Sequence, residues 1–205
     1  MAIRKSLYFK ESALAHEMLD GLKGVEIGGS AHNSIGLDCI NVDRFAADDP
    51  RFKKYRDEQE KMCGEFMPVD VVSDGDKLPF KDGEFDFVIS SHVIEHFFDP
   101  IGAIREWMRV ASKYIFIICP QPDALESDMD KEITPLEELI NRFQSGGNGP
   151  DIKDEHHTRW TCQGFANMCM WIFLQDWGKN WETCAVENPD GKVGNGFTIV
   201  LKRNT

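Results

Sequence analysis

Residues 24–43 read GVEIGGSAHNSIGLDCINVD, and this stretch decides the fold. Apolar residues flank a single acid, Glu26, and indicate a short strand. Small residues at 28–31 form a turn, and a second apolar run ends in Asp43. This order is typical of a βαβ nucleotide site, where small residues let the backbone approach the ligand and a carboxylate on the next strand binds ribose hydroxyls.

The acid inside the first strand restricts the kind of ligand. A carboxylate at Glu26 would repel a pyrophosphate bound at the following turn. A ligand that carries an amine or another positive charge would be attracted by it. The stretch therefore favours a nucleotide-linked cation over a dinucleotide.

Composition limits the class of protein. The chain has 205 residues, 41% of them hydrophobic and 28% charged, which predicts a single domain over residues 1–205. No apolar run approaches membrane-spanning length, so we expect no membrane span. Six cysteines without a CxxC pair are typical of a reducing compartment and predict a cytoplasmic protein. The net charge of -12 argues against nucleic acid as a partner.

Strand and helix patterns alternate along the chain. Apolar or alternating runs predict seven strands, at 25–28, 39–43, 69–73, 85–91, 114–119, 181–187 and 196–201. Helical spacing predicts five helices, at 12–22, 49–64, 99–111, 134–143 and 161–172. This order predicts an α/β fold: a doubly wound, Rossmann-like, mostly parallel seven-stranded sheet with an antiparallel C-terminal hairpin and helices on both faces.

Several helix starts carry their own signals. Ser12, Asp99 and Thr161 are predicted N-caps, and Pro100 after Asp99 fits the first helical position. Residues 134–137, TPLE, read as a capping box. In such a sheet the ligand lies beyond the carboxyl ends of the strands.

At those strand ends the residues resemble a known family. The stretches EIGGS, DGDKLPF and FDFVISSHVIEH, together with Asp43, are similar to the class I S-adenosylmethionine-dependent methyltransferases; they lie at 26–30, 74–80 and 85–96. The closest likeness is to the small methyltransferases with an LPF…FD…HV.EH…DP run, which is nearly complete here from Leu78 to Val110. The resemblance implies a methyltransferase fold, a transferase activity and S-adenosylmethionine as cofactor.

The resemblance also implies which residues bind the cofactor. Glu26 and the following turn would hold its methionine end, Asp43 would accept its ribose hydroxyls, and Asp74 would accept its adenine amino group. Ser91 and His92 would line the floor below the sulfonium. The implied set is Glu26, Gly28, Gly29, Ser30, Asp43, Asp74, Gly75, Ser91 and His92. The sequence departs from the family where Ser30 and His32 replace the usual glycines.

Methyl transfer needs alignment of the acceptor and exclusion of water, and a base only when the acceptor must lose a proton. The candidate bases are His92 and His157. The run DEHHTRW at 154–160 has three interpretations: a metal site, a polar loop, or a rim that contacts the acceptor through His157, Arg159 and Trp160. A third metal ligand at a characteristic spacing is missing, so we expect no metal.

The acceptor is the least specified part. Two polar segments, 44–68 and 121–160, are expected to build its pocket. The resemblance points to a small-molecule acceptor, such as a hydroxyl of a sugar or a cell-envelope precursor. Two alternatives stay open: a protein that binds S-adenosylmethionine without catalysis, and an NAD-dependent oxidoreductase, against which Glu26 and the missing third glycine count.

Overall fold

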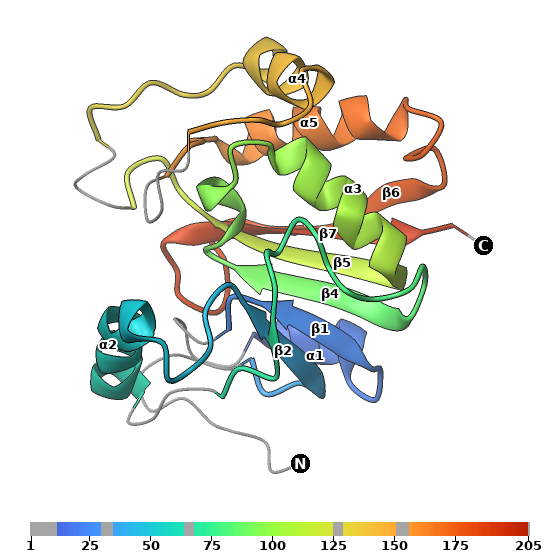
Figure 1. Ribbon diagram of the computed structural model, residues 1–205. Helices are drawn as coiled ribbons and strands as arrows, with labels where there is room; N and C mark the ends of the chain where they lie inside the picture. Colours follow the sequence, from blue (N-terminus) through green and yellow to red (C-terminus); the bar gives the residue numbers. More distant parts are fainter. Residues whose placement is uncertain (1–11, 30–34, 64–67, 125–128, 151–155, 205) are drawn as a thin grey trace.

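A computed structural model describes residues 12–29, 35–63, 68–124, 129–150 and 156–204 (Figure 1). Seven strands form one sheet in the order β3-β2-β1-β4-β5-β7-β6. Their bounds are β1 (Gly24–Ile27), β2 (Cys39–Asp43), β3 (Val71–Val72), β4 (Phe85–Ser91), β5 (Ala111–Pro120), β6 (Trp181–Glu187) and β7 (Gly196–Arg203). Strands β1 to β5 run parallel, whereas β7 is antiparallel to both β5 and β6. The predicted fold class is confirmed.

Helices cover both faces of the sheet. Figure 1 shows α3, α4 and α5 stacked over one face. The α-helices are α1 (Ala13–Leu19), α2 (Lys53–Cys63), α3 (Pro100–Val110), α4 (Leu136–Gln144) and α5 (Cys162–Phe173). Two short 3-10 helices, η1 (Pro50–Phe52) and η2 (Ile94–His96), precede α2 and α3.

The core is divided by the sheet into two hydrophobic clusters. Successive residues of β4 alternate between them, because strand side chains point to opposite faces. Val88 packs in the cluster under α3 and α5, whereas Phe87 and Ile89 pack against α1. All three side chains are fully buried. The continuous apolar run of β4 is therefore explained by burial on both faces.

Three predicted helix caps are confirmed. The Ser12 hydroxyl accepts the N–H of Ala15 at 3.2 Å. The Asp99 carboxylate accepts the N–H of Gly102 at 2.8 Å, with Pro100 at the start of α3. The Thr161 hydroxyl accepts a backbone N–H three residues on, at 3.0 Å. These caps work through local geometry, so the sequence alone identifies them.

The predicted capping box at 134–137 is wrong. Helix α4 begins after Pro135 and has no side-chain cap. Thr134 instead pairs with a distant part of the chain: its N–H donates to the Arg159 carbonyl at 2.9 Å, and its hydroxyl accepts the Arg159 N–H at 3.1 Å. The Thr134 hydroxyl therefore makes a tertiary contact with Arg159 instead of capping α4.

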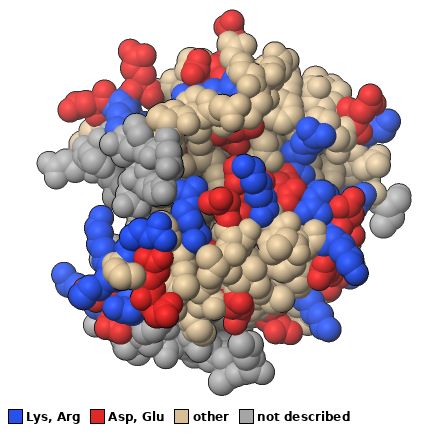
Figure 2. All heavy atoms as spheres, in the orientation of Figure 1, with Lys and Arg blue, Asp and Glu red and all other residues tan. Residues whose placement is uncertain are grey.

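The surface carries both signs of charge. Figure 2 shows basic and acidic side chains interspersed on one face of the molecule. Some of these charges form ion pairs, for example Arg109 with Asp82 at 2.8 Å. Within the described ranges, no helix combines the length and the apolar character needed to cross a membrane.

Candidate active site

The turn after β1 brings the backbone close to its neighbours. Gly28 has φ of +71°, and a Cβ there would lie 2.7 Å from a methyl group of Val93. A Cβ on Gly29 would lie 2.7 Å from the carboxyl carbon of Glu26 and 3.0 Å from Oδ1 of Asn41. Gly28 therefore requires glycine, whereas a side chain at Gly29 would have to displace the side chains of Glu26 and Asn41. Ser30 and His32, which continue this turn in the sequence, lie outside the described residues.

Glu26 is a buried acid directly beneath this turn. Its side chain is 3% exposed, and burial raises its pKa to about 7, although the nearby charge of Lys192 lowers it in part. The carboxyl group is thus close to half ionised at neutral pH. A ligand ammonium bound beside it would favour the charged form, so the site is suited to a cation.

We expect Glu26→Gln to flatten the dependence of stability on pH. The native carboxyl stays protonated up to about pH 7, whereas the unfolded one ionises near 4.5. The native state then binds more protons in this window, so the free energy of unfolding falls as pH rises through it, by on the order of 3 kcal/mol. Urea unfolding of the ligand-free protein between pH 5 and 8 measures this loss.

The glutamine variant should lack most of that decline, and the control Glu17→Gln, on an exposed position of α1, should keep it. If the profiles of wild type and Glu26→Gln run parallel, the pKa of Glu26 is not raised.

Two acids at the next strand ends lie on the same edge of the sheet. Asp43 ends β2, and its carboxylate accepts the N–H of Phe45 at 3.3 Å. Burial raises the pKa of Asp43, while the backbone N–H groups of Phe45 and Arg44 oppose the shift. Asp74 follows β3 and pairs with the Arg44 guanidinium at 2.8 Å. The predicted adenine and ribose acids are thus neighbours through Arg44.

Gly75 is held against both β1 and α3. Its carbonyl accepts the indole N–H of Trp107, which is fully buried, at 2.7 Å. A Cβ at Gly75 would lie 2.7 Å from a methyl group of Ile27 and 2.9 Å from the ring of Phe97. The loop after β3 is therefore fixed beside the end of β1, as a site for an adenine ring would require.

At the end of β4, Ser91 and His92 lie under the same edge. The Ser91 hydroxyl is buried and has no hydrogen-bond partner among the residues described. His92 has the uncommon φ of +56°, and its N–H donates to the Ile118 carbonyl at 2.9 Å. Burial lowers the pKa of His92 to about 4, helped by the charges of Lys192 and His156 and opposed by Asp190. Its imidazole is neutral at pH 7.

Sequence reasoning missed the loop between β6 and β7. It folds back onto the site and carries Lys192, which is only 3% exposed. The charge of Lys192 acts on both Glu26 and His92, so the ammonium lies near both. Asp190 orders this loop, since its carboxylate accepts four backbone N–H groups at 2.7–3.1 Å. A lysine beside a predicted turn is ordinarily exposed, so no local signal marks Lys192.

The segment 156–160 is anchored to η2 and to the core. The N–H groups of His157 and Thr158 donate to the Glu95 carbonyl at 2.9 and 3.3 Å. The Arg159 guanidinium donates twice to the Pro122 carbonyl, at 2.9 and 2.7 Å. His157 and Arg159 are half-buried. The backbone of His157 is therefore held against η2, whereas Arg159 contacts Thr134 and Pro122.

Trp160 occupies a different environment from the rim that the sequence suggested. Its side chain is 2% exposed and packs edge-to-face on Phe165, with ring centroids 5.2 Å apart. Its indole N–H has no partner within the described part of the chain. Contact with an acceptor at Trp160 stays a prediction, and it requires the acceptor to reach a core side chain.

A third potential metal ligand emerges beside His156. The Nε2 of His156 lies 3.8 Å from Oε1 of Glu95, and the Nε2 of His96 lies 4.0 Å from the same oxygen. The expectation of no metal rested on the lack of such a partner in the sequence around 154–160. Glu95 and His96 belong to η2, far from His156 along the chain, so spacing could not reveal the cluster.

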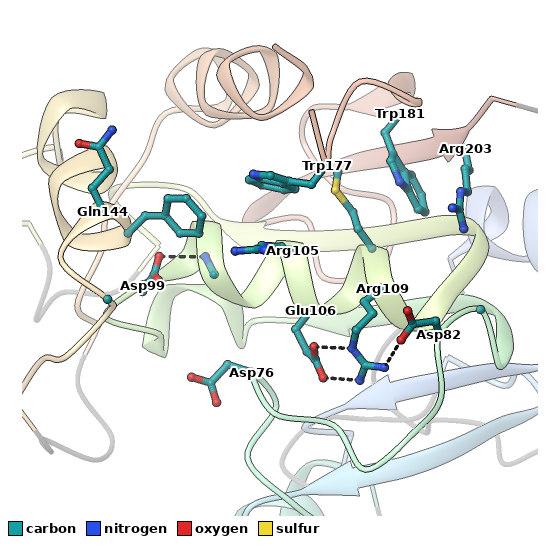
Figure 3. A pocket seen from close by; sticks show the side chains of 15 residues that line it. Asp76, Asp82, Asp99, Arg105, Glu106, Arg109, Gln144, Trp177, Trp181 and Arg203 are labelled. Atoms are coloured by element: carbon teal, nitrogen blue, oxygen red, sulfur yellow. Dashed lines mark hydrogen bonds and ion pairs between the residues drawn. The ribbon is translucent and has the colours of Figure 1, made fainter. Parts of the chain in front are cut away.

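A separate pocket of about 1050 Å³ runs along the outer side of α3 (Figure 3). Arg109 lines this pocket and pairs with Asp82 and Glu106. The Arg105 guanidinium lies 5.6 Å from the centroid of the Trp177 ring. The residues that line this pocket include none of the predicted cofactor ligands. The pocket is therefore distinct from the site at the carboxyl edge.

Part of the chain is similar in sequence to known methyltransferases. Residues 28–118 match a family described as "Methyltransferase domain". Ajmaline N-methyltransferase of Rauvolfia serpentina is 37% identical over 69 residues, which are 34% of this chain. The aligned residues cover 22% of the length of that relative.

Two solved structures show the same fold over nearly the whole chain. A SAM-dependent methyltransferase from Methanosarcina mazei aligns with a TM-score of 0.55 at 15% identity, covering 98% of this chain and 99% of that one. A protein from Rhodobacter sphaeroides, provisionally named a Zn-dependent alcohol dehydrogenase, aligns with a TM-score of 0.56 at 14% identity, covering 100% and 92%. At such identities the likeness is one of fold alone.

The family match covers residues 28–118, and the aligned structure shows that the likeness in fold extends over nearly the whole chain.

Proposed function

We propose that this chain is an S-adenosylmethionine-dependent methyltransferase that transfers the cofactor's methyl group to a small-molecule acceptor. The observation that carries the proposal is the acid-lined carboxyl edge, which overlaps the region of the family match at Asp43, Asp74 and Gly75 and begins just before it at Glu26. Glu26 lies under a glycine turn there, Asp43 ends the next strand, and Gly75 is fixed beside both. These groups suit a cationic nucleoside better than a pyrophosphate.

Each part of the cofactor has a proposed partner. The ammonium of the methionine end would meet Glu26, whose carboxyl is about half ionised at pH 7 and would be shifted to the charged form by a bound cation. The ribose hydroxyls would meet Asp43, and the adenine would lie between Asp74 and the backbone of Gly75. Ser91 and His92, which close the end of β4, would face the sulfonium. The cofactor supplies an activated methyl group, so the protein mainly has to align the acceptor and exclude water.

The acceptor would enter on the side of the segments 44–68 and 121–160. His157 and Arg159 belong to the second segment, and the His157 N–H donates to the Glu95 carbonyl of η2. A hydroxyl acceptor, such as that of a sugar or an envelope precursor, must lose a proton during transfer, and His92 and His157 are the proposed bases. An amine acceptor that binds in its neutral form would need no base.

The first test measures binding. Thermal shift with S-adenosylmethionine, S-adenosylhomocysteine and NAD should show stabilisation by the first two ligands only. At a ligand concentration of 100 times Kd, mass action contributes about 2.7 kcal/mol, which is readily detected in a melting curve. Stabilisation by NAD alone would contradict the proposal and favour an oxidoreductase.

Turnover then separates an enzyme from a binding protein. A panel of sugar hydroxyls and small amines, incubated with methyl-labelled cofactor, should release S-adenosylhomocysteine with at least one acceptor class. Release that is independent of any added acceptor serves as the blank. Binding of the cofactor with no transfer to any of the panel would favour the non-catalytic alternative.

A further inference from the structure

The geometry points to a binding site for a divalent transition-metal ion formed by Glu95, His96 and His156. One ligand atom of each residue lies within 4.8 Å of the others. Two imidazoles and one carboxylate form a common ligand set for Zn²⁺ and related ions, and they leave coordination positions open. This proposal is independent of the proposed function, because metal binding can be measured without turnover.

The distances are close to those of a loaded site. Zinc bound at about 2.0–2.1 Å to each ligand places tetrahedral donor atoms roughly 3.3–3.5 Å apart. The Glu95 oxygen lies 3.8 Å from the His156 nitrogen and 4.0 Å from the His96 nitrogen. All three ligand atoms lie within 4.8 Å of one another, so closing around one ion requires them to approach by up to about 1.5 Å.

The burial of the Glu95 carboxylate favours a positively charged partner beside it. Glu95 is 1% exposed, and its Oε1 lies 3.8 Å from the Nε2 of His156 and 4.0 Å from the Nε2 of His96. A buried carboxylate is costly unless a positive charge compensates it. A divalent ion supplies that charge while leaving both imidazoles neutral, as metal ligands must be.

The backbone around the cluster is preorganised. The Glu95 carbonyl accepts the N–H groups of His157 and Thr158 and the Thr158 hydroxyl, which lies 3.3 Å away. Arg142 of α4 donates to the His157 carbonyl at 3.0 Å. The residues that directly follow His156 are therefore fixed both to η2 and to α4. Such support is what holds ligands in place before an ion arrives.

The cluster also has an opening. The His96 side chain is 37% exposed, whereas that of His156 is 11% exposed. The two rings pack edge-to-face with centroids 4.8 Å apart. An ion can thus enter past His96 and reach the buried oxygen of Glu95. The site would lie just beyond the end of β4, next to the residues proposed to face the sulfonium.

The test uses the full chain without an affinity tag, because tag histidines bind the same ions. After chelator treatment and dialysis, titration calorimetry with Zn²⁺ should show one site per chain. Co²⁺ should give visible absorption bands typical of a low coordination number. His96→Ala and His156→Ala should each weaken Zn²⁺ binding at least tenfold, and His96 is exposed enough for its variant to fold.

His16→Ala is the matched control, since His16 lies in α1 and pairs with Asp20 away from the cluster. It should bind Zn²⁺ like the wild type. Circular dichroism of each variant checks that loss of binding does not come from unfolding. The proposal is overturned if the wild type binds no Zn²⁺, or if folded His96→Ala and His156→Ala bind it unchanged; the cluster is then a structural histidine–carboxylate contact only.

Discussion

Asp43→Ala is expected to weaken binding of S-adenosylhomocysteine by tenfold or more while leaving the fold intact. A carboxylate that accepts two ribose hydroxyls makes charge-assisted hydrogen bonds of roughly 1.5–3 kcal/mol each, and about 1.4 kcal/mol corresponds to tenfold in affinity. The residue ends β2, and its carboxylate accepts the N–H of Phe45 at a long 3.3 Å. Its removal therefore costs the native state little.

Titration calorimetry of the two proteins measures this effect. Asp38→Ala is the matched control, because Asp38 is an exposed acid just before the other end of the same strand. It should bind the ligand like the wild type. Asp43→Asn, which keeps one acceptor oxygen, should fall between the two. Unchanged affinity in Asp43→Ala would remove Asp43 from the proposed ribose site.

Asp190→Ala should give the largest loss of stability, on the order of 4 kcal/mol. The carboxylate is 3% exposed and accepts the N–H groups of Lys192, Val193, Gly194 and Gly196. Alanine would leave these donors without their acceptor and release the loop that carries Lys192. Denaturant unfolding measures the change in the free energy of unfolding.

The pH dependence of this effect has a definite sign. Burial alone would raise the pKa of Asp190, but the four backbone N–H groups outweigh it and the pKa is lowered. The stabilisation is thus present above the ordinary pKa of an aspartate and is lost as pH falls through the lowered value. Asp176→Ala, at a fully exposed position, should change stability by less than about 0.5 kcal/mol. A loss below about 1 kcal/mol for Asp190→Ala would mean that the loop is ordered by other contacts.

Features that depend on neighbouring residues could be predicted from the sequence alone. The sequence determined the seven strands, their parallel order followed by a hairpin, and the caps at Ser12, Asp99 and Thr161. These features depend on side-chain periodicity and on hydrogen bonds between residues three positions apart, which are written locally in the chain. The glycine turn at Gly28 and Gly29 was likewise visible, because only glycine tolerates the backbone conformation at Gly28.

Only the tertiary structure decided which loops meet at the carboxyl edge. The loop between β6 and β7 places Lys192 near Glu26 and His92. The segment before α5 places His156 beside Glu95. Sequence periodicity does not predict these contacts of Lys192 and His156, because they depend on how loops fold back across the sheet. The same reason explains why Thr134 pairs with a distant backbone instead of capping α4. Burial of a lysine or an acid is a property of the assembled edge, and residue type alone predicts the opposite.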